Sequence, residues 1–293
     1  MRGEGVRQTA SGEKRADGGG GWAQAGASHP DPSHAPPDRL SPSLRWLPVW
    51  QRNFQVWKKL AGPSILGNLA DPLLYMLGLG YGLGRFLGEV QGVPYLTFLA
   101  AGTLAYSVMN SATFETLYSA FSRMHVQKTW EAILNTPLTL TDVLLGEWLW
   151  ATSKSLLSGL AILLVIWALG LYADFAMTLW LLPVIVLTGL TFAGLGLMLN
   201  AVAPNYDFFL YYFTLFITPM VLLSGVFYPT DALPGWLAAA AQGLPLTHAI
   251  ALARPLVLGH WPEAPLLNVL VLLAFALTGF LIGLALTRRR LLR

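Results

Sequence analysis

Residues 175–206 read FAMTLWLLPVIVLTGLTFAGLGLMLNAVAPNY, a run of 32 residues without Asp, Glu, Lys or Arg. A helix needs about 20 mostly apolar residues to cross a lipid bilayer, so this run is long enough to do so. Residues 264–287 give a second run of 24 residues without these charges. These two runs predict an all-α integral membrane protein.

Composition supports this fold class and excludes others. Hydrophobic residues make up 55% of the 293 residues and charged residues only 11%, against about 25% in soluble domains. An ordinary soluble enzyme, a DNA-binding domain and a disordered chain are therefore excluded. The chain has no cysteine, which rules out disulfides and cysteine-based metal sites. It also lacks the G-x-x-x-x-G-K-[ST], H-E-x-x-H and G-x-S-x-G motifs. We therefore expect no catalytic residue, metal or cofactor on this chain, and no nucleic-acid partner.

Further apolar runs bring the expected number of membrane-spanning helices to six. The expected spans are 63–84, 95–117, 145–171, 177–202, 208–228 and 265–286. Residues 232–253 are also uncharged, but Pro and Gly interrupt them, so we expect short helices that dip into the outer interface. Residues 1–44 are rich in Gly, Pro and Ser and are expected to form a disordered tail. The membrane domain is expected at 45–293.

Positive charges in the loops predict the orientation, because cytoplasmic loops carry the excess of Lys and Arg. The loops on the side of both termini carry ten: Arg45, Arg52, Lys58, Lys59, Arg123, Lys128, Arg288, Arg289, Arg290 and Arg293. The alternate loops carry only Arg85 and Arg254. We expect both termini in the cytoplasm and a multi-pass protein of the cell inner membrane, surrounded by lipid.

Residues 45–60 combine aromatic and basic side chains. Trp46, Trp50, Phe54 and Trp57 recur at spacings of three or four, which places them on one face of a helix. The cations of this segment are Arg45, Arg52, Lys58 and Lys59. The pattern is typical of a helix that lies in the headgroup layer. A plain juxtamembrane anchor is the simpler interpretation.

Four ionisable residues lie in or beside the expected spans, where a charge at the bilayer centre costs about 2.5–3.5 kcal/mol. They are Asp71, Glu115, Glu147 and Lys154. Asp71 precedes Pro72, a pair that favours a helix start with Asp as its cap; a pore-facing carboxylate is the alternative. Lys154, two turns beyond Glu147, either reaches the cytoplasmic surface or pairs with a carboxylate. These scattered residues do not predict a proton relay.

The loop at 123–142 contains the segment TWEAIL at 129–134. Trp130, Ile133 and Leu134 share one face of a short helix, and Pro137 stops that helix. The helix either lies on the membrane or docks into a groove of a soluble partner.

Small residues four apart favour close helix packing in lipid. Such pairs are Gly80 and Gly84, Gly189 and Ala193, and Gly279 and Gly283. The glycine-containing faces of the first and last spans are also candidates for a dimer interface.

Three segments resemble the permease subunits of type-2 ABC exporters. They are TWEAILNTP at 129–137, TPMVLLSGVFYP at 218–229 with Leu233-Pro234 after it, and LPLTH at 244–248 with Arg254 downstream. Three further segments look like the nodulation-factor branch of this family, which exports lipo-oligosaccharides. They are RNFQVWKKL at 52–60, NLADPLLY at 68–75 and GLGYGLG at 78–84.

The resemblance implies a permease that works with a separate ATP-binding subunit, which uses the ATP and Mg. Two permeases, a homodimer, would assemble with two ATPases. A coupling helix would contact the ATPase through Lys128, Thr129, Trp130, Glu131, Ile133, Leu134 and Pro137. The helix at 45–60 would be the connecting helix at the entry to the transport path. An outer gate would involve Pro219, Ser224, Gly225, Pro229, Pro245, His248 and Arg254, with His248 structural and bonded to nearby backbone.

The cargo is less sharply indicated. Tyr211, Tyr212 and Phe213 in the fifth span would offer stacking faces for sugars, although an aromatic belt or core packing is the favoured interpretation. A permease of this design would equally serve drugs or polysaccharide. A membrane-embedded transferase would need clustered carboxylates or His at one membrane face. An ATP-independent, ion-driven transporter would need internal repeats with ionisable groups at the midplane.

Overall fold

The computed structural model describes residues 44–291, and most of these residues are helical. The tail predicted at 1–44 lies, but for its last residue, outside the described residues. The principal helices are α1 (Leu47–Lys58), α2 (Ala61–Gly82), α4 (Tyr95–Phe114), α6 (Leu140–Ala168), α8 (Leu181–Val202), α12 (Pro245–Val257) and α13 (Pro265–Leu291). Shorter helices are α3 (Gly84–Leu87), α5 (Thr129–Leu134), α7 (Phe175–Thr178), α9 (Asp207–Tyr212), α10 (Thr218–Leu223) and α11 (Gly235–Ala241).

The remaining elements are small. Strands β1 (Glu89–Val90) and β2 (Val93–Pro94) pair antiparallel. The π-helical turns η3 (Glu115–Ser119) and η4 (Ser122–Val126) extend α4, the π-helical η5 (Phe213–Ile217) joins α9 to α10, and η6 (Thr230–Ala232) is a 3₁₀ turn.

Three helical segments of the described chain are long and apolar enough to cross a membrane: α6, Phe175–Val202 and α13. The bent pair of α11 and α12 gives a fourth if it is counted as one span. Helices α2 and α4 have 22 and 20 residues but are less apolar. The span predicted at 208–228 is a shorter helix that ends at Leu223, because the chain turns at Gly225, whose φ is +84°. Sufficient length and apolarity are thus combined in three or four of the described segments, where six spans were predicted.

Helix α6 begins before the predicted residue 145 because a capping box starts it. The Thr139 hydroxyl accepts a hydrogen bond from the Asp142 backbone N–H, and the Asp142 carboxylate accepts one from the Thr139 N–H at 2.8 Å. This reciprocal pair satisfies backbone donors at the start of the helix. Pro137, two residues upstream, separates α6 from α5.

Asp71 does not cap a helix, so that interpretation of the Asp71–Pro72 pair is wrong. Both residues lie inside α2, which continues through Pro72. A cap would need non-helical backbone at Asp71, whereas the preceding ten residues are already helical. The Asp71 side chain is exposed and accepts a hydrogen bond from the Tyr106 hydroxyl of α4 at 2.8 Å. Asp71 therefore links α2 to α4 and does not cap a helix.

Helices α8 and α13 pack with their backbones close together. A Cβ added at Gly279 would lie 2.7 Å from the carbonyl carbon of Gly194, and one at Gly283 would lie 3.0 Å from the Met198 nitrogen. The prediction that Gly279 and Gly283 allow close packing is confirmed. Because their face is covered by α8 of the same chain, it is not available for the dimer interface expected on the last span.

A side chain of α13 also caps the C-terminal end of α8. The Arg290 guanidinium donates hydrogen bonds to the backbone oxygens of Ala201 at 3.0 Å and Ala203 at 2.8 Å. A basic side chain at this position satisfies carbonyl groups that have no partner within the helix.

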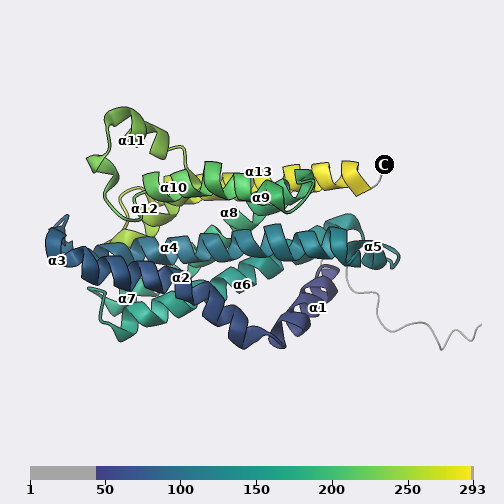
Figure 1. The fold of residues 1–293 in the computed structure, drawn as a ribbon, viewed down its shortest axis with the longest axis horizontal. Helices are drawn as coiled ribbons and strands as arrows, with labels where there is room; N and C mark the ends of the chain where they lie inside the picture. Colours follow the sequence, from purple (N-terminus) through teal and green to yellow (C-terminus); the bar gives the residue numbers. More distant parts are fainter. Residues whose placement is uncertain (1–43, 292–293) are drawn as a thin grey trace, which may run out of the picture. The chain divides into compact units, whose positions relative to one another are not determined.

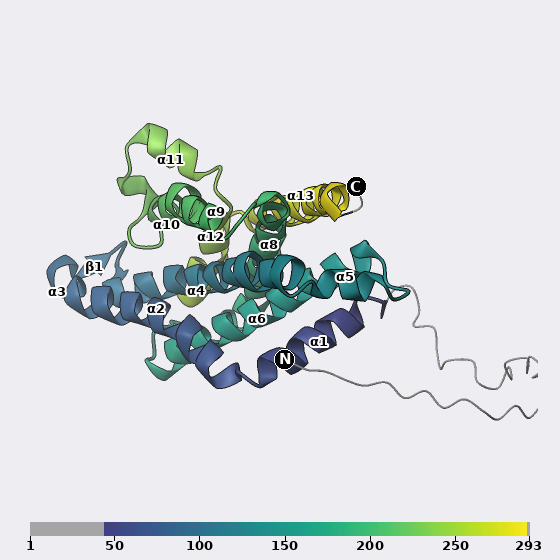
Figure 2. The same ribbon diagram turned by 45° about the vertical axis from the view of Figure 1, so that its right-hand side comes forward.

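The two sets of connections lie at opposite ends of the bundle. Figure 1 shows α5 and the end of α13 at one end, and α3, α7 and α11 at the other. Turned by 45°, Figure 2 shows α1 beside α6, with its first turn near the α5 end of the bundle. The short interrupted helices predicted at 232–253 are confirmed: α11 and α12 meet at 88°.

Candidate functional site

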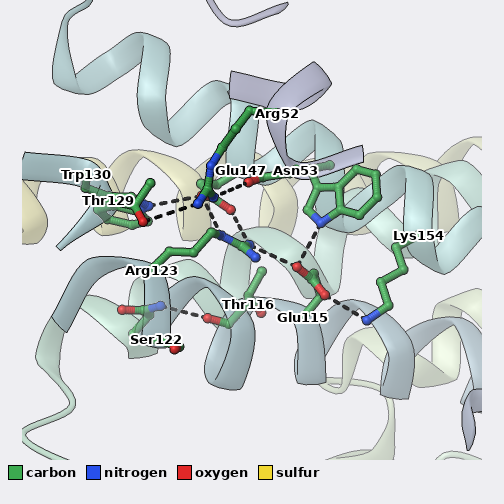
Figure 3. Close-up of polar contacts among 12 residues, drawn as sticks. Arg52, Asn53, Glu115, Thr116, Ser122, Arg123, Thr129, Trp130, Glu147 and Lys154 are labelled. Carbon is green, nitrogen blue, oxygen red and sulfur yellow. Dashed lines mark hydrogen bonds and ion pairs between the residues drawn. The ribbon is translucent and has the colours of Figure 1, made fainter. Parts of the chain in front are cut away.

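Four charged side chains meet where α5 joins the bundle. Glu115 begins η3, Arg123 lies in η4, and Glu147 and Lys154 lie on α6. We call these four residues the charged cluster; Figure 3 shows Arg123 between the two carboxylates. They come from two helical segments that pack side by side.

The charged cluster is held by short ionic hydrogen bonds. Arg123 donates to Glu147 through Nε at 2.9 Å and Nη2 at 2.5 Å, and to Glu115 through Nη2 at 2.9 Å. Lys154 donates to the other oxygen of Glu115 at 2.8 Å. Glu115 and Glu147 are 3% and 1% exposed. Two cations thus balance two carboxylates, as burial of ions requires.

Two tryptophans complete this arrangement. The indole N–H of Trp130 donates to Glu147 at 3.0 Å, and that of Trp150 donates to Glu115 at 2.8 Å. Burial alone would lower the pKa of Arg123, but the carboxylates of Glu147 and Glu115 raise it above its ordinary value. Arg123 therefore stays charged and bridges the two buried carboxylates.

The sequence analysis singled out three members of this cluster as separate ionisable residues, but it did not predict that they lie in contact. Lys154 pairs with Glu115, one of the two outcomes predicted for it, and not with Glu147 on its own helix. Arg123 entered the prediction only as a loop charge. A usable signal was present, because Glu115 and Arg123 are eight residues apart and so lie near one face of a helix.

Helix α1 packs its aromatic stripe against α6. The ring of Trp50 stacks on Phe54 with centroids 5.4 Å apart, and both contact Trp150 edge-on at 6.1 and 6.3 Å. Trp57 contacts the same ring at 6.0 Å. Trp50, Phe54 and Trp57 therefore share one face of the helix, as predicted. Arg45 and Trp46 precede the helix, and Lys58 and Lys59 are exposed at its end.

Arg52 links α1 to the start of α5. Its guanidinium donates to the Thr129 hydroxyl at 3.3 Å and to the side-chain oxygen of Asn53 at 3.0 Å. Helix α1 is therefore connected to α5, and α5 to the charged cluster through Trp130 and Glu147 (Figure 3).

The apolar face of α5 points into the protein. The prediction that this face meets the membrane or a soluble partner is therefore wrong. Trp130 is 1% exposed, and Ile133 and Leu134 pack against the same internal cluster. The Glu147 carboxylate explains this orientation, because it gives the indole N–H a buried partner. The outward residues are Lys128 and Glu131, which form an exposed ion pair at 3.6 Å. Pro137 is also exposed.

A cavity of about 620 Å³ lies between α2, α4 and the α9–α10 segment. Its lining includes Asp71, Tyr75, Tyr106, Asn110, Phe114, Phe213, Thr218 and Phe227. Of the three aromatic residues proposed for the cargo path, Phe213 lines this cavity. Tyr211 is exposed, and Tyr212 stacks on Phe216 with centroids 5.8 Å apart. The cavity combines aromatic faces with one carboxylate and several hydrogen-bonding groups.

Two of the gate candidates meet at the opposite end of the bundle. Arg254 of α12 donates to the backbone oxygen of Gly225 at 2.5 Å, and its guanidinium lies 3.7 Å from the centroid of the Phe98 ring. The turn at Gly225 is thereby fastened to α12. Ser224, beside it, is buried.

The other gate candidates are distributed along the same region. His248 bonds the backbone oxygen of Gln242 at 2.9 Å, as expected, and the Asn268 side chain at 2.7 Å. Pro219 lies at the start of α10, Pro229 before η6, and Pro245 begins α12.

Comparison with known proteins gives a matching family model and several similar proteins. Residues 46–258 match a family model described as ABC-2 type transporter. The chain is 51% identical over 251 residues to nodulation protein J of Rhizobium leguminosarum bv. trifolii, covering 86% of this chain and 95% of that protein. It is 48% identical over 247 residues to nodulation protein J of Rhizobium meliloti, covering 84% and 94%. It is 25% identical over 248 residues to the inner membrane transport permease YadH of Escherichia coli, covering 83% and 93%.

Proposed function

Because this chain belongs to the ABC-2 type transporter family, we propose that it is the permease half of an ATP-driven exporter of lipo-oligosaccharides. A separate ATP-binding subunit uses ATP and Mg, and two permeases assemble with two ATPases. The chain crosses the inner membrane six times, with both termini in the cytoplasm. The similarity to nodulation protein J over most of the chain supports this cargo class.

The observation that carries the proposal is the double attachment of α5. Its inner face is fixed to α6 through Trp130 and Glu147, and Arg52 holds Thr129 to α1. Its outer face exposes the ion pair of Lys128 and Glu131, where another protein can contact it. Contact with an ATPase is therefore made by this polar face.

A displacement of α5 moves α1 and α6 with it. Separating the buried partners of the charged cluster costs about 3–5 kcal/mol, more than the 0–1 kcal/mol typical of an exposed ion pair. When α5 is displaced, other contacts between helices of the bundle therefore change before the ionic contacts of the charged cluster break. The cavity beside Phe213 lies between α2, α4 and the α9–α10 segment, where relative movement of the helices changes its width.

The chemistry of the cavity suits part of a glycolipid head. Tyr75, Tyr106 and Phe213 present aromatic faces, and Asp71 is a strong acceptor for sugar hydroxyls. Its volume of about 620 Å³ falls among small-molecule pockets, roughly 300–1,000 Å³. The cavity of one chain is therefore large enough for a small-molecule-sized part of the glycolipid head.

The test uses charge reversal on the outer face of α5. Glu131→Arg is expected to reduce co-purification of a Walker-motif ATPase at least about tenfold, as loss of roughly 1.4 kcal/mol does, and to reduce export of lipo-oligosaccharide into the medium. Glu263→Arg makes the same change at an exposed site near the start of α13 and is expected to change neither.

Equal ATPase recovery with both variants would contradict the role of α5. Absence of any ATPase from the unmodified permease, in a detergent that preserves a known ABC complex, would contradict the exporter proposal itself.

A further inference from the structure

A second pocket, separate from the cargo cavity, lies beside the charged cluster. It has a volume of about 220 Å³ and is bounded by α1, the start of α2, the η3–η4 segment and α6. Arg52, Arg123 and Lys154 provide three cations in its wall, and Trp57 and Trp150 provide aromatic faces. We call it the α1 pocket.

The α1 pocket carries more positive than negative charge. Glu115 is the carboxylate in its wall, and Glu147 behind Arg123 brings the total to two against three cations. Within residues 44–291, Arg52 pairs with no carboxylate; its bonds go to the neutral side chains of Asn53 and Thr129. Burial and the neighbouring Arg123 lower the pKa of Arg52 by more than Glu147 raises it. An anion placed here would remove this imbalance.

Asn53 supplies a second, independent observation. It is only 3% exposed, yet its side-chain N–H₂ group has no hydrogen-bond partner among the described residues. It lies in the wall of the α1 pocket. A buried donor left unpaired costs about 1–3 kcal/mol, a cost that an acceptor bound in the pocket would offset. Arg52 also retains donors, because a guanidinium carries five N–H groups and only some are engaged.

The rim of the α1 pocket is apolar and open to its surroundings. Val56 and Leu60 are 53% and 62% exposed and lie in its lining. Beyond Leu60, the first turns of α2 expose Ile65 and Leu66. A ligand with a charged head and a hydrocarbon tail satisfies both parts of this surface, whereas a free inorganic anion leaves the apolar rim uncovered.

We propose that the α1 pocket binds the phosphate headgroup of an anionic membrane phospholipid. Arg52 and the Asn53 N–H₂ group bind the phosphate oxygens, and the acyl chains follow the exposed apolar side chains from Val56 to Leu66. This site is separate from the cargo cavity and does not depend on which cargo is exported.

The test is a lipid titration of the full-length chain in a neutral detergent, with bound lipid counted by native mass spectrometry. The probes are dihexanoyl phosphatidic acid, dihexanoyl phosphatidylcholine and inorganic phosphate. Phosphatidic acid is expected to bind about tenfold more tightly than phosphatidylcholine, the effect of one charge-assisted hydrogen bond of roughly 1.4 kcal/mol. Inorganic phosphate is expected not to displace it at equal concentration.

Matched variants assign the binding to the α1 pocket. Arg52→Gln is expected to weaken phosphatidic acid binding about tenfold, and Arg52→Lys to retain most of it. Lys58→Gln removes one charge from the same helix outside the pocket and is expected to change binding less than about twofold. Asn53→Leu removes the unpaired donor, together with the oxygen that accepts from Arg52, without changing charge, and is expected to weaken binding too. Variants are compared only when their unfolding temperature matches the unmodified chain.

Equal binding of the two lipids, or equal effects of Arg52→Gln and Lys58→Gln, would overturn the proposal. Displacement by inorganic phosphate at equal concentration would overturn the lipid origin of the ligand.

Discussion

Replacement of Glu147 by Leu tests the charged cluster most directly. This carboxylate is 1% exposed and accepts three hydrogen bonds, two from Arg123 and one from Trp130. The substitution leaves an excess positive charge and an unpaired indole N–H inside the protein. Breaking a buried pair by removing one partner costs about 3–5 kcal/mol. At roughly 2–4 °C per kcal/mol, the unfolding temperature should fall by roughly 6–20 °C.

The double variant Arg123→Met with Glu147→Leu separates the charge effect from general damage to packing. The two substitutions together restore neutrality and leave the 2.8 Å pair of Lys154 and Glu115 intact. Replacing both members of a buried pair by apolar side chains is often neutral or stabilising. We therefore expect the double variant to be more stable than Glu147→Leu alone, although it carries one more change.

The assay is thermal unfolding in mild detergent, followed by size-exclusion chromatography of the fluorescently tagged protein at several heating rates. Glu147→Gln is the control that keeps the shape and one acceptor, and it should lie between the unmodified chain and Glu147→Leu. A double variant less stable than Glu147→Leu alone would refute the reasoning, since it would mean that removing the second charge does not relieve the imbalance left by the first.

Two further predictions concern helix packing and the cavity. Gly279→Ala should lower stability by about 1–3 kcal/mol, because its Cβ would meet the backbone of Gly194; Gly78→Ala, with open space around it, should be neutral or stabilise α2 by up to about 1 kcal/mol. Thermal unfolding of the two variants measures the difference, and equal losses would contradict the close packing of α8 and α13. Tyr106→Phe should leave stability within about 1 kcal/mol but reduce lipo-oligosaccharide export, since it removes the hydroxyl that orients Asp71. Export unchanged in Tyr106→Phe and in Asp71→Asn would remove the cavity from the transport path.

Hydropathy and helical periodicity predicted most of the helices. The uncharged runs became α8 and α13, and the Pro and Gly residues around 234–245 marked the bend between α11 and α12. The limit of such reasoning appears at 208–228. Its composition permits a continuous span, but the turn at Gly225 depends on Arg254, which is 29 residues away.

The direction of a helical face was harder to predict than its existence. The spacing of Trp130, Ile133 and Leu134 correctly placed them together, but periodicity does not say what covers a face. The residues that cover this face include Glu147, which bonds Trp130 and lies 17 residues away in the sequence. Asp71 shows the same limit, since the pair with Pro72 is equally compatible with a helix start and with a helix that continues. The charged cluster escaped prediction because its bonds join residues 24 and 39 positions apart.

The attachment of α8 to α13 also has a consequence for biosynthesis. The carbonyl groups at Ala201 and Ala203 leave the ribosome almost 90 residues before Arg290, which binds them. At about 5–20 residues per second, this interval lasts roughly 4–18 seconds. During that time the face of α8 around Gly194 and Met198, which α13 covers in the folded chain, lacks this helix as its neighbour. A nascent chain truncated before α13 therefore presents this face to lipids and to the quality-control machinery of the membrane.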